Sequence, residues 1–126
     1  MTARRAQSAV AGISLVYDLA IGLALLAAVD SFAGLFGVPV PEPRTFVTLT
    51  GLFLVCVGIG YAQPMRDPSR HRGYLWVFGP ILKGAGAGVF LIEHFAHGAP
   101  RSYLLFASTD GALALATLWA LTLSSE

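Results

Sequence analysis

Four long apolar runs, separated by short polar segments, make up nearly the whole chain. They cover approximately residues 8–29, 45–63, 74–96 and 102–123. A helix needs roughly 20 residues to cross a hydrocarbon core of about 30 Å, and each run is close to that length. The pattern predicts an all-α, polytopic membrane protein in which residues 1–126 form a single domain, a four-transmembrane-helix bundle.

Prolines mark the expected limits of these helices. Pro39, Pro41 and Pro43 alternate with other residues at the end of segment 32–43. Because proline lacks an amide hydrogen and restricts the preceding residue, this segment is expected to follow an extended path along the membrane interface. Pro64 is expected to stop the second helix near Gln63. Pro80 lies in the first turns of the third helix, where a missing hydrogen bond and a kink are most easily tolerated.

Arginines are distributed unequally between the two sides of the predicted bundle. On one side are Arg4, Arg5, Arg66, Arg70 and Arg72, and on the other are Arg44 and Arg101. The positive-inside rule therefore predicts that the N- and C-termini are cytoplasmic. The cluster Arg66, Arg70 and Arg72 could also bind a lipid headgroup or another anion, but a topology signal explains it without any ligand.

Composition supports the membrane class and excludes several others. Hydrophobic residues make up 56% of the chain and charged residues 12%, against roughly 25% charged in soluble domains. A net charge of +1 lacks the clustered cationic excess that binds nucleic acid. The single cysteine, Cys56, excludes an internal disulfide and a multi-cysteine zinc site. The expected partner is the lipid bilayer, with no nucleic acid.

Three ionisable residues interrupt the apolar runs at membrane depth: Asp18, Lys83 and Asp110. At about 1.5 Å of rise per residue, they lie about 15, 13 and 18 Å from the cytoplasmic edge. A charge in the hydrocarbon region is expensive unless a neighbouring helix supplies a partner. The sequence therefore predicts a shared polar centre near the midplane.

Two interpretations of this Asp-Lys-Asp centre are open. In the structural one, Lys83 bridges the first and fourth helices and determines which helix faces pack together. In the functional one, the centre is an ion or proton site. Two carboxylates and one ammonium leave a surplus negative charge, so one aspartate should be neutral or reach water.

The third apolar run carries two further patterns. Gly84 and Gly88 have the GxxxG spacing typical of close helix packing in membranes. His94 and His97 are one turn apart and could help to bind a metal or haem. They lie at the outer end of the run without a third ligand, so interfacial histidines satisfied by water are the preferred interpretation. We therefore predict no cofactor.

The order of these features resembles small bacterial four-helix inner-membrane proteins of uncharacterised function. The residues that carry the resemblance are Asp18, Phe36-Gly37, Pro41, Gly58, Tyr61, Arg66-Asp67-Pro68-Ser69-Arg70, Lys83-Gly84 and Asp110. This resemblance implies a multi-pass protein of the cell (inner) membrane and implies no activity. In architecture alone the chain is also similar to DoxX-type four-helix proteins, from which no functional residue carries over.

Two function classes follow from the sequence. The first is a structural or accessory membrane protein that packs with itself, as a homo-oligomer, or with a larger membrane complex. The alternative is a proton-coupled small-solute transporter or channel that uses the Asp-Lys-Asp centre. The chain has no Gly-rich phosphate loop, nucleophile elbow or hydrolase triad pattern, so no catalytic residue is predicted and an enzyme is disfavoured.

Overall fold

The computed structural model describes residues 2–123, and within this range the fold is entirely helical. The helices are α1 (Ala3–Ala27), α2 (Val29–Phe36), α3 (Thr45–Gly60), α4 (Ala62–Arg66), α5 (Arg72–Trp76), the π-helical turn η1 (Val77–Ile81), α6 (Leu82–His97) and α7 (Ser102–Thr122). With α3 joined to α4, and α5 and η1 joined to α6, four helices in this range are long and apolar enough to cross a membrane: 3–27, 45–66, 72–97 and 102–122. The chain thus has the architecture of a multi-pass membrane protein.

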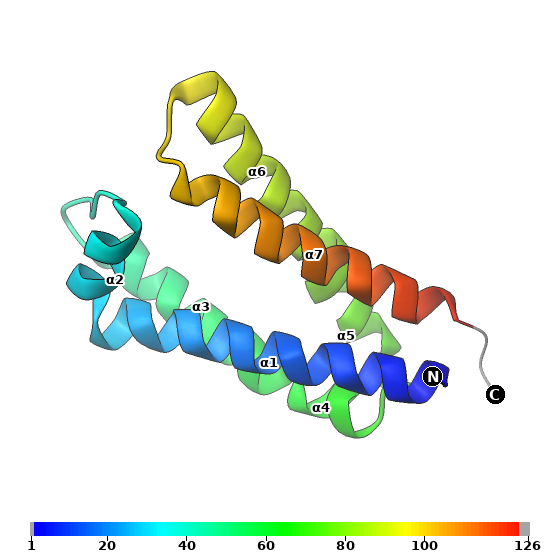
Figure 1. Cartoon of the computed structure of the whole chain (residues 1–126). Coiled ribbons are helices and arrows are strands. Elements are labelled where there is room, and N and C mark those ends of the chain that lie inside the picture. Colours follow the sequence, from blue (N-terminus) through cyan, green and yellow to red (C-terminus); the bar gives the residue numbers. More distant parts are fainter. Residues whose placement is uncertain (1, 124–126) are drawn as a thin grey trace.

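The four long helices form two hairpins. Helices α1 and α3 pack together in one, and α6 and α7 pack together in the other. Figure 1 shows the hairpins meeting at one end of the molecule, where the start of α1, α4, α5 and the end of α7 gather. They diverge toward the other end, where α2 and the α6–α7 turn lie. We call these the closed end and the open end.

The closed end contains the best-buried large side chains. Tyr61, Leu75 and Leu121 are at most 2% exposed and pack in one cluster that spans both hairpins. A side-chain bond joins the hairpins as well, because Gln7 Nε2 donates to the carbonyl of Ala120 at 3.1 Å. The start of α1 and the end of α7 therefore lie side by side at the same end of the molecule.

Close approach inside the first hairpin depends on glycine. A Cβ atom added at Gly22 of α1 would lie 2.8 Å from the backbone nitrogen of Val55 and 2.9 Å from the carbonyl oxygen of Gly51. Backbone atoms cannot move aside as a flexible side chain can, so only a glycine fits here. By contrast, a Cβ at Gly84 would have its nearest neighbour at 3.9 Å, and one at Gly88 would meet open space.

The segment after the first span differs from the expected extended path, because residues 29–36 form helix α2. The alternating prolines begin only at Pro39, so they leave the preceding turns free to be helical. Gly37 ends α2 with a left-handed φ of 64°, and the amide of Val38 bonds to the carbonyl of Ala33 at 2.9 Å. Residues 37–44, between α2 and α3, form the non-helical part of this segment.

The expectation that Pro64 stops the second helix was wrong. The helix breaks at Tyr61, and α4 then starts at Ala62 and continues to Arg66. Pro64 falls in the first turn of α4, where amide groups need no partner inside the helix. The helical chain ends instead at Asp67, just before Pro68.

Candidate functional site

A buried ion pair joins the two hairpins. Lys83 Nζ of α6 lies 2.8 Å from Asp18 Oδ2 of α1, and the two side chains are only 4% and 3% exposed. The ammonium also lies 5.2 Å from the ring centre of Tyr61 and 5.9 Å from that of Tyr17. Aromatic faces attract cations most strongly where water is excluded. The Lys83 ammonium thus contacts one carboxylate and lies near two aromatic rings.

An irregular turn directly precedes Lys83. The amide of Leu82 bonds to the carbonyls of Val77 and Gly79, rather than to Phe78, its ordinary α-helical partner. Pro80, which has no amide hydrogen, lies within this π-helical turn. The freed carbonyl of Phe78 accepts a bond from the Tyr61 hydroxyl at 2.8 Å. This hydrogen bond therefore connects the second and third spans close in sequence to Lys83.

Asp110, the third member of the predicted centre, lies on α7 and is half-buried. It faces α6, since a Cβ added at Gly86 would be 3.5 Å from its Oδ2 atom. Within residues 2–123 it forms no ion pair, and Lys83 pairs with Asp18 instead. The structure therefore brings Asp18 and Lys83 into contact and leaves the Asp110 carboxylate without a cationic partner in the described chain.

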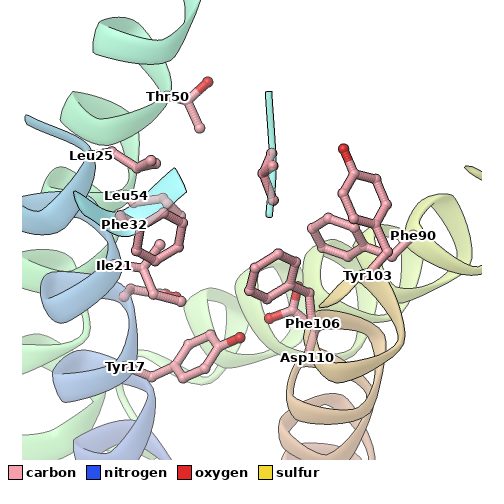
Figure 2. Close-up of a pocket in the computed structure, with 12 residues that line it drawn as sticks. Tyr17, Ile21, Leu25, Phe32, Thr50, Leu54, Phe90, Tyr103, Phe106 and Asp110 are labelled. Atoms are coloured by element: carbon pink, nitrogen blue, oxygen red, sulfur yellow. The ribbon is translucent and has the colours of Figure 1, made fainter. Parts of the chain in front are cut away.

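Asp18 and Asp110 both lie on the wall of a cleft of about 320 Å³ between the hairpins. Figure 2 shows Tyr17, Ile21 and Leu25 on one side of it and Phe90, Tyr103, Phe106 and Asp110 on the other. Phe32 of α2 and Thr50 and Leu54 of α3 complete much of the lining. The cleft is mostly apolar, with two carboxylate residues among its few polar groups.

A hydrogen bond beside the cleft connects α1 to α7. The hydroxyl groups of Tyr17 and Thr109 are 2.6 Å apart. In Figure 2 the hydroxyl of Tyr17 points across the cleft toward the α7 side, where Asp110 lies. The Tyr17–Thr109 bond and the Lys83–Asp18 pair thus both cross between the hairpins beside the cleft.

A cluster of aromatic rings surrounds the cleft, and sequence reasoning did not find it. Phe106 of α7 lies 6.2 Å from Phe32 and 5.1 Å from Phe36 of α2, and 5.4 Å from Phe90 of α6, measured between ring centres. Tyr103 packs edge-on to Phe90 at 5.2 Å. The spacing of Tyr103 and Phe106 places them on one face of α7, but nothing in the sequence indicates that α2 approaches that face.

His94 and His97 occupy the end of α6. The Nδ1 atom of His94 is 2.7 Å from the carbonyl oxygen of Ala99, just beyond Gly98, which ends the helix with a φ of 71°. His94 thus has a local role in the turn, while His97 is exposed. Within residues 2–123, no three His, Cys, Asp or Glu side chains are grouped closely enough to hold a metal ion.

The predicted topology arginines lie at the closed end. Arg66 and Arg70 are exposed, and the carbonyl of Arg66 accepts a bond from Arg4 at 3.2 Å. The guanidinium of Arg72 donates to the carbonyl of Leu121, which is a common way for a cation to satisfy the end of a helix. The side chains of Arg4 and Arg72 therefore connect helix ends where the hairpins meet.

A charged group outside the spans lies at the open end. Arg44, just before α3, donates to both carboxylate oxygens of Asp30 on α2, at 2.8 and 3.2 Å, and to Glu42 at 3.1 Å. Its guanidinium holds the pKa of the Asp30 carboxyl below its usual value through these hydrogen bonds and their charge. This contact ties α2 to the start of α3.

Comparison with known proteins gives no relative. No protein-family model, no curated protein and no solved structure matches the chain. Function is therefore inferred from the geometry of the cleft and its polar groups.

Proposed function

We propose that this protein is a multi-pass membrane protein that binds a small solute in the cleft between its hairpins and moves it in exchange for protons. The observation that carries the proposal is a cleft of about 320 Å³ whose lining includes Asp18 and Asp110, of which only Asp18 has an ion-pair partner in the described chain. Mostly apolar concave sites with a few placed polar groups are typical of small-molecule binding.

The charge balance of the centre supports proton coupling. Lys83 is committed to Asp18 at 2.8 Å in a buried position, so one ammonium offsets one carboxylate. The second carboxylate, on Asp110, must then take up a proton, bind a cation or reach water, since an uncompensated charge at membrane depth is costly. A group with these alternatives can exchange a proton for a bound solute.

The proposed orientation follows from the arginines and the shared position of the helix ends. With both termini in the cytoplasm of a bacterial cell, the closed end faces inward under the positive-inside rule. The open end, with α2 and the α6–α7 turn, then faces outward. In this arrangement the cleft admits solute from the outer side, and the closed end separates it from the cytoplasm.

Proton movement in reconstituted vesicles tests the proposal. Vesicles containing the full chain and a trapped pH-sensitive dye are mixed with one of three external probes: benzyltrimethylammonium, benzenesulfonate or benzyl alcohol. We expect at least one probe to change the internal pH above the level in protein-free vesicles. Asp110→Asn should abolish this change, whereas Asp67→Asn, at the closed end, should retain it. No change with any probe contradicts the proposal.

A second candidate function is favoured by the ion pair itself. Lys83 and Asp18 join the two hairpins in a buried contact, so the centre could serve assembly alone in a structural or accessory protein. The open space beside Gly88 leaves room for a helix of a second copy or of a larger complex. Native mass measurement in mild detergent tests this candidate, and a monomer without a stoichiometric partner counts against it.

A further inference from the structure

We infer that the solute bound in the cleft is an organic cation, an ammonium compound with an apolar body whose charged head lies between Asp110 and the aromatic rings around it. The inference rests on the proposed use of the cleft as a binding site and goes further by naming the class of solute. Three properties of the lining lead to it: its charge, its aromatic rings and its remaining apolar surface.

The charge of the lining favours a cation. Two of the residues around the cleft are aspartates, and none is lysine, arginine or histidine. The nearby ammonium of Lys83 is directed to Asp18 at 2.8 Å, and its side chain is only 4% exposed. An anionic solute would meet Asp110 without a compensating cation, whereas an ammonium group would supply the positive charge that Asp110 lacks in the described chain.

The aromatic rings favour an ammonium over a small metal cation. Phe32, Phe90, Tyr103 and Phe106 all line the cleft, and neighbouring ring centres are 5.2–6.2 Å apart. In Figure 2, Phe106 and Asp110 project from the same side of the cleft, with Tyr103 and Phe90 beside them. Aromatic groups of this kind recognise alkylated ammonium heads through the ring faces, while hard metal ions require several oxygen ligands.

The remaining walls favour an apolar body attached to that head. Ile21 and Leu25 of α1 and Leu54 of α3 line the cleft across from Asp110 (Figure 2), and Val38 also contributes to the lining. The volume of about 320 Å³ is at the lower end of the range for small-molecule sites. A benzyl or short alkyl ammonium therefore matches the cleft better than a bulky one. A lipid acyl chain is the competing occupant, and it would need no carboxylate.

Binding of benzyltrimethylammonium to the full chain in zwitterionic lipid nanodiscs tests the inference. Equilibrium dialysis with the radiolabelled compound, corrected with empty nanodiscs, gives the affinity. We expect saturable binding that Asp110→Asn weakens at least tenfold and Phe106→Leu weakens severalfold. Asp67→Asn, between α4 and α5 and outside the lining of the cleft, should leave the affinity unchanged. Unlabelled benzyl alcohol and benzenesulfonate, which lack the cationic head, should displace the label poorly.

The outcomes separate this inference from the proposed function. If benzyl alcohol or benzenesulfonate binds as tightly as the ammonium compound, or if folded Asp110→Asn keeps the wild-type affinity, the cation class is wrong and the cleft remains a binding site. If none of the three probes binds saturably, the inference and the proposed binding role of the cleft both fail. Gel filtration and the unfolding temperature establish that each variant is folded.

Discussion

The closed and open ends of this molecule use similar residues in opposite ways. At the closed end, Tyr61, Leu75 and Leu121 fill the space between the hairpins and are almost fully buried. At the open end, Phe32, Phe90 and Phe106 are only half-buried, and a cleft of about 320 Å³ remains between the hairpins. Aromatic and aliphatic side chains thus complete a core at one end and line a cavity at the other.

The contrast indicates that the cleft depends on how the hairpins separate, and not on a shortage of apolar residues. Lipid tails are as apolar as leucine, so helices in a membrane associate through close packing and polar contacts rather than through water exclusion. At the closed end both kinds of contact are present, including the Gln7 bond to Ala120. The Lys83–Asp18 pair is a further polar contact between the hairpins.

The largest effect is expected from breaking the Lys83–Asp18 pair. Lys83→Met leaves Asp18 buried without its partner, which should cost about 3–5 kcal/mol of unfolding free energy. The double variant Asp18→Asn with Lys83→Met should recover most of that loss, because no unpaired charge remains. Thermal unfolding in detergent compares the two proteins. A double variant no more stable than Lys83→Met would show that the two side chains do not stabilise the fold as a pair.

A smaller effect should show that the first hairpin is tightly packed. Gly22→Ala places a methyl group against the backbone of Val55 and Gly51, and overpacking of this kind costs about 1–3 kcal/mol. Gly88→Ala is the matched control, because its methyl group meets open space and alanine favours the helix. Equal unfolding temperatures for the two variants would contradict the close approach of α1 and α3.

Removing one tyrosine hydroxyl group at each end should lower the stability unequally. Tyr61→Phe loses the bond to the Phe78 carbonyl, which should cost about 1 kcal/mol. Tyr103→Phe, at the open end, removes a hydroxyl that forms no hydrogen bond within residues 2–123 and should have little effect on unfolding. If the two variants lose the same stability, the π-helical turn before Lys83 is not held by Tyr61.

The smallest effect is expected from acidification, which should weaken the contact between Arg44 and Asp30 of α2. Arg44 lowers the pKa of the Asp30 carboxyl in the folded protein. Their contact is therefore at full strength above the unfolded value of about 3.9 and is lost as pH falls through the lower folded value. The protection of the α2 amides, that is, their exchange corrected for the intrinsic rate at each pH, should fall on acidification, and Arg44→Gln should flatten that dependence. An unchanged pH profile in Arg44→Gln would exclude the contact as its cause.

Much of this architecture could be predicted from the sequence, because lengths of apolar runs translate directly into helices. The contacts between particular side chains could not be predicted. Asp18, Lys83 and Asp110 were expected together, yet which carboxylate reaches Lys83 depends on helix rotation and on the π-helical turn at Pro80. The position of Phe32 beside Phe106 depends on α2, whose helical form the later prolines obscured. Local patterns therefore describe single helices better than the contacts between them.

Accessibility to a water-soluble thiol reagent tests the central claim, a cleft that is open on one side of Asp110 and closed on the other. In a Cys56→Ser background, Phe106→Cys and Ala11→Cys place one thiol on the cleft wall and one in the closed-end core. A membrane-impermeant, charged thiosulfonate reagent is added to intact cells. Rapid modification is expected at position 106 and none at position 11. Modification at 11 but not at 106, or equal modification at both, would contradict it.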